Sequence, residues 1–136
     1  MRILAIDFGT KHTGFALGDN GVSMPYSQVS SKSVDFVVEQ TLKILNTENI
    51  EQIIVGLPVA YNNIKIQDNI KNFIKSLSQK TNININTIDE DFSSKEAFED
   101  NFEKFSDIKH IKKIIHKTSA EKILQNYYLA NPKERG

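Results

Sequence analysis

The chain has 136 residues, 39% of them hydrophobic and 25% charged, a composition typical of one globular domain over residues 1–136. The formal net charge is zero, so no overall basic field points to nucleic acid, and any such site has to be a local patch. The absence of cysteine excludes a disulfide framework and a cysteine-ligated zinc site. No apolar run approaches transmembrane length, and the chain opens directly into a strand, so we expect a cytoplasmic protein without a membrane partner.

An apolar run that ends on a carboxylate is the first feature of the chain. Residues 3–6 suit a strand buried on both faces, and Asp7 follows them. Gly9 and Thr10 then permit a tight turn into the apolar residues 15–17, which predicts a hairpin. A carboxylate at the end of a central strand costs free energy, which a metal ion or a phosphate–metal complex would offset. The alternative is that Asp7 bonds to the backbone of its own turn.

Periodicity and capping signals predict the remaining elements. The strand–helix–strand order implies a partly parallel sheet, and the opening hairpin adds antiparallel strands. We therefore predict an α/β fold, a mixed five-stranded sheet with helices on both faces. The further elements, in chain order, are an edge strand over 22–26, a helix over 34–46 capped by Ser33, a strand over 52–58, a helix over 66–77, a strand over 82–88, a helix from Ser93, a basic loop over 104–117, a last helix from Thr118, and a frayed tail over 131–136.

Ionisable residues end two of the predicted strands. Asp7 ends one, and the acidic residues 89–91 follow another, while His116 lies just before the predicted last helix. If these positions converge at one edge of the sheet, they could hold Mg²⁺, which prefers oxygen ligands. Two such ions about 4 Å apart can activate a water and stabilise the leaving oxygen of a phosphodiester. The pattern thus favours metal-dependent phosphoryl chemistry, although the sequence supplies only the ligand types.

Four motifs, in order and at matching spacing over nearly the whole chain, resemble the YqgF/RuvX family. These are small proteins with an RNase H-like fold, related to the Holliday-junction resolvases. The resemblance implies a nuclease that uses Mg²⁺ or Mn²⁺ and processes the 5′ end of the 16S rRNA precursor, or else resolves four-way DNA junctions. The motifs are residues 6–14 (Ile-Asp-Phe-Gly-Thr-Lys-His-Thr-Gly), 55–58 (Val-Gly-Leu-Pro), 89–97 (Asp-Glu-Asp-Phe-Ser-Ser-Lys-Glu-Ala) and 116–120 (His-Lys-Thr-Ser-Ala) with 123–125 (Ile-Leu-Gln).

The resemblance implies three catalytic and metal-binding positions. Asp7 matches the first acid of the family and Glu90 the second, whereas His116 stands where a third acid is usual. A neutral imidazole can replace a carboxylate as ligand and suits Mn²⁺ better than Mg²⁺. His116 is therefore a candidate ligand or general base, and the alternative is an exposed residue without a ligand role.

Other positions are candidates for contact with the substrate backbone. His12 and Asp91 stand where the family usually has arginines, and an Asn pair replaces its usual Asp-Gly pair. Basic side chains near the metal site would give salt-dependent affinity that does not depend on sequence, although a solvated Lys-rich loop is the alternative. The predicted nucleic-acid contacts are Lys11, His12, Asn62, Asn63, Lys112, Lys113 and Lys117.

Two other functions compete with a nuclease. Residues 7–10 (Asp-Phe-Gly-Thr) also resemble the phosphate loop of actin-like ATPases, but one short domain lacks the second lobe and the second loop that enclose ATP. The substituted third acid also allows a nucleic-acid-binding module that has lost catalysis. We expect a monomer or a weak homodimer, and a stable dimer would favour the junction because two strands need two active sites.

Overall fold

The computed structural model describes residues 1–58, 64–90 and 108–132, with only the backbone described for residue 90 and residues 108–118. The strands and helices predicted within these ranges are present, and the helix predicted from Ser93 lies outside them. The elements, in chain order, are β1 (Arg2–Asp7), β2 (His12–Asp19), β3 (Val22–Ser30), α1 (Val34–Thr47), β4 (Gln52–Pro58), α2 (Ile64–Ser78), β5 (Asn84–Glu90) and α4 (Ile108–Ala130).

The five strands form one mixed sheet in the order β3-β2-β1-β4-β5. β1 is central: it pairs antiparallel with β2 and parallel with β4, and β4 pairs parallel with β5. β3 lies at an edge, as predicted, and the register shifts so that Phe15 faces Ser27 while Ala16 faces Pro25. A proline is tolerated here because an edge strand at a bulge needs fewer backbone donors. The predicted mixed sheet is thus confirmed.

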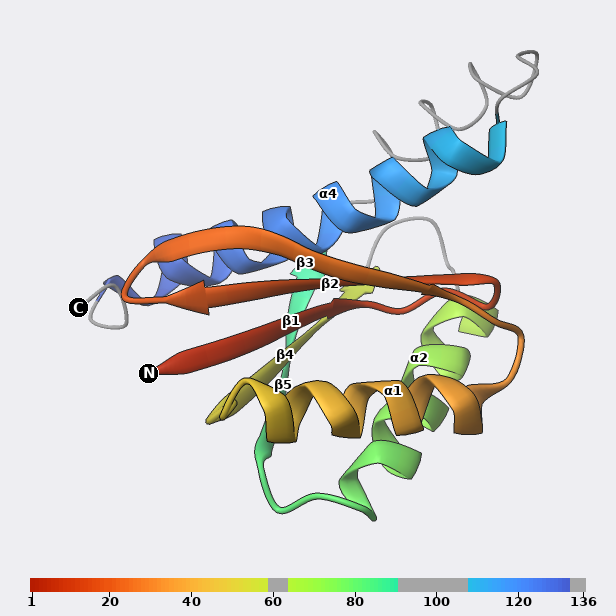
Figure 1. Ribbon diagram of the computed structural model, residues 1–136, viewed down its shortest axis with the longest axis horizontal. Coiled ribbons are helices and arrows are strands. Elements are labelled where there is room, and N and C mark those ends of the chain that lie inside the picture. The colour runs from red at the N-terminus through yellow and green to blue at the C-terminus, as the bar shows by residue number, and fades with distance from the viewer. Residues whose placement is uncertain (59–63, 91–107, 133–136) are drawn as a thin grey trace.

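Helices cover both faces of this sheet, as predicted. Figure 1 shows α1 and α2 together on one face and α4 crossing the other. Successive residues of β1 point to opposite faces, so Leu4 and Ile6 pack in the cluster that includes α1 and α2, whereas Ile3 and Ala5 pack with α4. Burial on both faces explains why β1 reads as a continuous apolar run rather than an alternating one.

Local capping signals begin α1 where the sequence predicts. The side chain of Ser33 accepts a hydrogen bond from the Phe36 amide at 3.2 Å, which satisfies one of the unpaired N–H groups of the first turn. The β2–β3 hairpin closes on Asn20 and Gly21, with φ values of 52° and 84°. An Asn-Gly pair suits this two-residue turn because both positions need positive φ.

The prediction of a basic loop before the last helix is wrong. α4 runs without interruption from Ile108 to Ala130, so most of the predicted loop is helical. Thr118 and Glu121 have the spacing of a capping box, but such a local pattern does not by itself interrupt a helix. Apolar residues at 108, 111, 114 and 115 continue the helical period upstream. Within the described ranges, no helix is both long enough and apolar enough to span a lipid bilayer.

A glycine in β2 allows α4 to approach the sheet closely. A Cβ atom added at Gly18 would lie 2.6 Å from Leu124 Cδ2 and 2.6 Å from the Tyr128 hydroxyl oxygen. Both α4 residues are buried, with at most 2% of either exposed. Gly18 therefore determines how near the C-terminal half of α4 packs to β2.

Candidate active site

Asp7 is the last residue of β1 and is almost fully buried, with 1% exposed. It faces Gly14 across the antiparallel ladder, and it follows Ile6, whose parallel partner on β4 is Val55. Because Ile3 and Ala5 pack with α4, the period of the strand places Asp7 on the face that α4 covers. The predicted position of this carboxyl group, at the carboxyl end of a central buried strand, is confirmed.

Hydrogen bonds between its own residues stabilise the turn after Asp7. Thr13 is fully buried, and its Oγ1 lies 3.4 Å from both the backbone nitrogen and the carbonyl oxygen of Gly9. Phe8 packs into the α1–α2 layer, where its ring stacks on Phe73 with centroids 4.5 Å apart and planes 12° apart. These contacts hold the backbone on the C-terminal side of Asp7, and β1 pairing holds it on the other.

Glu90 ends β5 at the same edge of the sheet. It pairs with Pro58, the last residue of β4, and the carbonyl of Pro58 accepts a hydrogen bond from the side chain of Gln67 on α2. Ile6 of β1 is level with Val55 of β4, which is level with Thr87 of β5. The next residue of β1, Asp7, is therefore level with position 88 of β5, and position 90 lies two residues further along. The backbones at positions 7 and 90 are two strands apart, which is about 10 Å across the sheet. They are also two residues apart along the strand direction, which is about 7 Å. The topology therefore brings both acidic positions to one edge.

Position 116 lies within α4 and not before a helix, contrary to the prediction. It is four residues, or about 6 Å of helix, before Ala120, which is buried in the core beneath α4. At the other end of the described helix, Tyr127 donates to Gln52 at the start of β4 at 3.2 Å, so α4 runs opposite to the central strands. Its N-terminal half therefore extends toward the carboxyl ends of β1, β4 and β5 (Figure 1).

The donors at this edge fit a hard divalent cation. The sheet fixes the position of Asp7, and the backbone of Glu90, the second predicted carboxylate ligand, lies at the same edge. Carboxylate oxygens are the ligands that Mg²⁺ and Mn²⁺ prefer. Among the side chains that the structure describes, which exclude those of Glu90 and His116, no three His, Asp or Glu residues form a group that could hold an ion.

Lys11 and His12 lie directly after the turn that follows Asp7. Lys11 is exposed, and its carbonyl oxygen accepts a hydrogen bond from the Ser31 amide at 2.9 Å. His12 is half-buried, with Nδ1 at 3.0 Å from the Ser30 hydroxyl oxygen. That hydroxyl also accepts a hydrogen bond of 2.9 Å from the Gln28 side-chain amide. The sequence did not single out Ser30 and Gln28, because only the pairing of β2 with β3 brings them beside His12.

The other predicted nucleic-acid contacts fall in two places. Asn62 and Asn63 lie outside the described residues. Lys112, Lys113 and Lys117 belong to the N-terminal half of α4 and not to a loop, which corrects the prediction. Their backbone positions place them toward the edge at which β1 ends, and their contact with a substrate stays a prediction.

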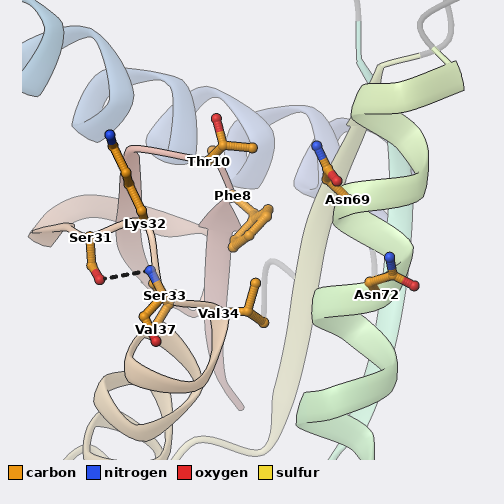
Figure 2. Close-up of a pocket in the computed structure, with 10 residues that line it drawn as sticks. Phe8, Thr10, Ser31, Lys32, Ser33, Val34, Val37, Asn69 and Asn72 are labelled. Atoms are coloured by element: carbon orange, nitrogen blue, oxygen red, sulfur yellow. Dashed lines mark hydrogen bonds between the residues drawn. The ribbon is translucent and has the colours of Figure 1, made fainter.

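A cavity of about 200 Å³, which the sequence did not predict, opens beside the same turn on the α1–α2 side. Figure 2 shows that the lining residues come from the β1–β2 turn, the segment that leads into α1, and α2. No sequence signal could have found it, because its walls come from three segments far apart in the chain. The lining residues are Phe8, Gly9, Thr10, Ser31, Lys32, Ser33, Val34, Val37, Asn69 and Asn72.

The sheet order, the helices on both faces and the acidic edge define an RNase H-like fold of the resolvase type. The structure of Thermus thermophilus RuvC matches with a TM-score of 0.64, covering 98% of each chain at 13% identity. T. thermophilus RuvC in complex with a Holliday junction substrate matches with a TM-score of 0.60, covering 96% of this chain and 95% of that chain at 11% identity. At such low identity these similarities show the fold alone.

Sequence comparison assigns the family. The model of the RuvX family, described as Holliday junction resolvase, matches residues 1–130. Relatives from several bacteria carry the name "Putative pre-16S rRNA nuclease". Those of Natranaerobius thermophilus and Malacoplasma penetrans are 33% and 35% identical, over 93% of this chain and 93% and 92% of theirs. That of Mycoplasma mobile is 36% identical, over 93% of this chain and 91% of its own. The chain belongs to the RuvX family, whose members are named as nucleases and resolvases.

Proposed function

We propose that this chain is a metal-dependent nuclease that hydrolyses phosphodiester bonds at the 5′ end of the 16S rRNA precursor, in the cytoplasm. The observation that carries the proposal is the buried Asp7 at the carboxyl end of the central strand, at the edge of the sheet where β5 also ends, two strands away. Burial of a carboxyl group costs free energy, and at the edge of a partly parallel sheet where ligands usually bind, a metal ion would offset that cost. The name shared by the relatives supports the RNA substrate.

In the proposed mechanism, Asp7 and Glu90 hold Mg²⁺ or Mn²⁺, with His116 as the third donor. A metal held there would supply Lewis acidity for the activation of a water and for charge on the leaving 3′ oxygen. Asp7 supplies a donor whose position is fixed by strand pairing before it and by the Thr13–Gly9 contacts after it. A fixed donor does not have to reorganise as charge develops, which is the main source of electrostatic catalysis.

Lys11 and His12 are proposed to contact the phosphate backbone beside the scissile bond. Both lie within five residues of Asp7. The Gln28–Ser30–His12 chain of hydrogen bonds holds the imidazole in one orientation, which lowers the entropy lost on binding. Such contacts position a substrate without reading its sequence.

A binding module without catalysis is the second candidate, and His116 favours it. A histidine replaces the third acid that the resemblance leads us to expect, so one anionic ligand is missing. Junction resolution is the alternative activity within the nuclease class, because RuvX is described as a resolvase family.

Cleavage of two substrates in parallel tests the proposal. A 5′-extended 16S precursor fragment and a four-way DNA junction are incubated with Mn²⁺, with Mg²⁺ and with chelator. We expect the precursor to be cut only with metal, and Asp7→Asn to lower the rate by about a hundredfold or more, a loss typical of removing a catalytic group. Circular dichroism checks that Asp7→Asn is folded.

The remaining outcomes each decide one point. Cleavage of the junction alone would replace the RNA substrate by DNA. Metal-independent cleavage that survives Asp7→Asn would refute the proposed site. If folded protein binds either nucleic acid without cutting it, the binding module becomes the conclusion.

A further inference from the structure

We propose that the cavity between the start of α1 and the side of α2 that carries Asn69 and Asn72 holds the base of one unpaired nucleotide of the substrate strand. The inference rests on the proposed function in so far as the ligand is a nucleic acid. It adds a second contact point, on the side of the sheet edge opposite to the metal site.

The position of the cavity links it to the catalytic edge. Its wall begins with Phe8, Gly9 and Thr10, the three residues that directly follow Asp7. Three residues span at most about 10 Å, so the mouth lies within that reach of Asp7. Neighbouring residues of a strand point to opposite faces, so the turn after β1 lies between the two sites. A strand that crosses this edge can present a phosphate to Asp7 and a nearby nucleotide to the cavity.

The lining suits a flat, partly polar ring. Phe8 and Val37 form an apolar wall and are at most 7% exposed, and the stacking of Phe8 on Phe73 keeps that wall in place. Asn69 and Asn72 present side-chain amides from α2 (Figure 2). An amide can both donate to and accept from the edge of a base, and single-stranded RNA exposes such edges to proteins.

Charge at the cavity favours an anionic ligand. Lys32 is the one charged side chain among the described lining residues, and it is exposed. Figure 2 shows Lys32, Thr10 and Asn69 around the upper part of the view, with Phe8 and Val34 between them. Lys32 thus supplies an exposed positive charge at the rim of the cavity, which favours the phosphate of a nucleotide there.

Size limits the occupant to a single ring system. About 200 Å³ corresponds to roughly six or seven water molecules at their liquid volume. That is below the 300 Å³ or more typical of pockets for complete small-molecule ligands. The cavity therefore has room for a base, and the proposal leaves the sugar and the phosphate at the mouth.

Nuclear magnetic resonance of the full-length, ¹⁵N-labelled protein locates the binding. A single-stranded RNA hexamer is titrated with chelator present, so that neither cleavage nor metal affects the result. We expect the amide signals of Gly9, Thr10 and Asn69 to shift progressively, and the same hexamer with one abasic position to bind about tenfold more weakly, as base contacts predict. Shifts confined to other residues would refute the proposal.

Matched variants separate this cavity from general attraction to RNA. Lys32→Gln should weaken hexamer binding about threefold to fivefold, whereas Lys71→Gln, an equal charge change on the exposed surface of α2 outside the lining, should change it little. Asn72→Phe should fill the mouth and remove the difference between the intact and the abasic hexamer. Equal losses in the two lysine variants, or an abasic effect that survives Asn72→Phe, would overturn the inference.

The outcomes distinguish this inference from the proposed function. Shifts at the cavity in a protein that cuts neither substrate would leave the nucleotide site standing and refute the nuclease. Cleavage that depends on Asp7, without shifts at the cavity, would do the reverse.

Discussion

Asp7 is withdrawn from water although its side chain is ionisable, and the surrounding residues make this possible. Its partner across the ladder is Gly14, and the residue after Val55 on the other neighbouring strand is Gly56. Neither glycine carries a side chain that would compete for the space beside the carboxyl group. The two glycines thus leave the neighbouring positions on both adjacent strands without a side chain next to Asp7.

Replacement of His116 tests its proposed role as a metal ligand. Imidazole suits Mn²⁺ better than Mg²⁺, whereas a carboxylate suits both. We therefore expect His116→Asp to lower the ratio of the cleavage rate with Mn²⁺ to that with Mg²⁺ by about tenfold, in the range reported for changes around metal ligands. Initial rates with each metal measure this ratio.

His110→Asp is the matched control, because it makes the same substitution in the same helix. An unchanged metal ratio in His116→Asp would exclude residue 116 from the ligands. A large gain with both metals would show instead that the natural chain is catalytically impaired.

Tyr26 makes stability depend on alkaline pH. Burial raises the pKa of its phenol, and the hydrogen bond to Glu48 at 3.1 Å and the charge of Glu48 raise this pKa further. Because the folded-state pKa exceeds the unfolded value of about 10, the contribution of this group is full below pH 10. It is lost as the pH rises through the folded pKa.

Tyr26→Phe should therefore lower the free energy of unfolding by about 1 kcal/mol at pH 7, the usual size of one hydrogen bond. The difference from the natural chain should shrink at pH 11. Urea unfolding at both pH values measures it, and an equal difference at both would contradict the assignment.

At the scale of elements, α4 combines a half that packs in the core with a half that carries predicted site residues. Its C-terminal half is buried against β1, β2 and β4 through Ala120, Ile123 and Leu124. Its N-terminal half carries His116 and the basic residues toward the carboxyl edge of the sheet. One continuous helix therefore couples the position of the third candidate ligand to the packing of the core.

Gly18→Ala should loosen this packing. The added Cβ would lie 2.6 Å from Leu124 Cδ2, so the helix or the side chain has to move. We expect a loss of about 1–3 kcal/mol in the free energy of unfolding, the usual cost of overpacking. Denaturant unfolding measures this loss.

A double-mutant cycle with Leu124→Ala tests the cause. Removing the Leu124 side chain creates room, so Gly18→Ala should cost less in that background. Additive losses would mean that the two residues do not clash, and would refute the close approach as the reason for the glycine.

At the scale of the whole molecule, the proposed function would depend on local charge and not on net charge. The formal net charge is zero, yet Lys11, Lys32 and the lysines of the N-terminal half of α4 belong to segments around the carboxyl edge of the sheet. An uncharged molecule with such a patch binds a polyanion in one orientation. This orientation would bring the backbone of the strand to Asp7.

The salt dependence of RNA binding tests this patch. Each lysine that contacts a phosphate of a single strand adds about 0.7 to the slope of log affinity against log salt. The triple variant Lys112→Gln, Lys113→Gln, Lys117→Gln should therefore reduce the magnitude of the slope by about 2. Fluorescence anisotropy with a labelled RNA at several salt concentrations measures it.

The control triple variant changes the same net charge on exposed positions of α1 and α2: Lys43→Gln, Lys71→Gln and Lys75→Gln. It should leave the slope nearly unchanged. Equal reductions in both triple variants would show that the protein attracts RNA through its total charge and not through α4.

Much of the fold follows from local signals. The apolar run before Asp7, the helical spacing from Val34 and the cap at Ser33 act within a few residues, so the sequence predicts β1 and α1 correctly. The capping-box spacing at Thr118 is equally local, but it misleads because the preceding residues also suit a helix. Local patterns indicate which structure a segment can adopt. Where two patterns compete, as the capping box and the helical period do around Thr118, the surrounding chain decides which one forms.

The sequence alone determined the class of the sheet, the strand-end position of Asp7 and the types of the candidate ligands. Only the tertiary structure decided that β5 ends beside the same edge, that Ser30 and Gln28 hold His12, and that α1 and α2 enclose a cavity next to the β1–β2 turn. The physical reason is that periodicity and capping are properties of neighbours along the chain. Strand register and the packing of helices on a sheet set the distances between segments far apart in sequence.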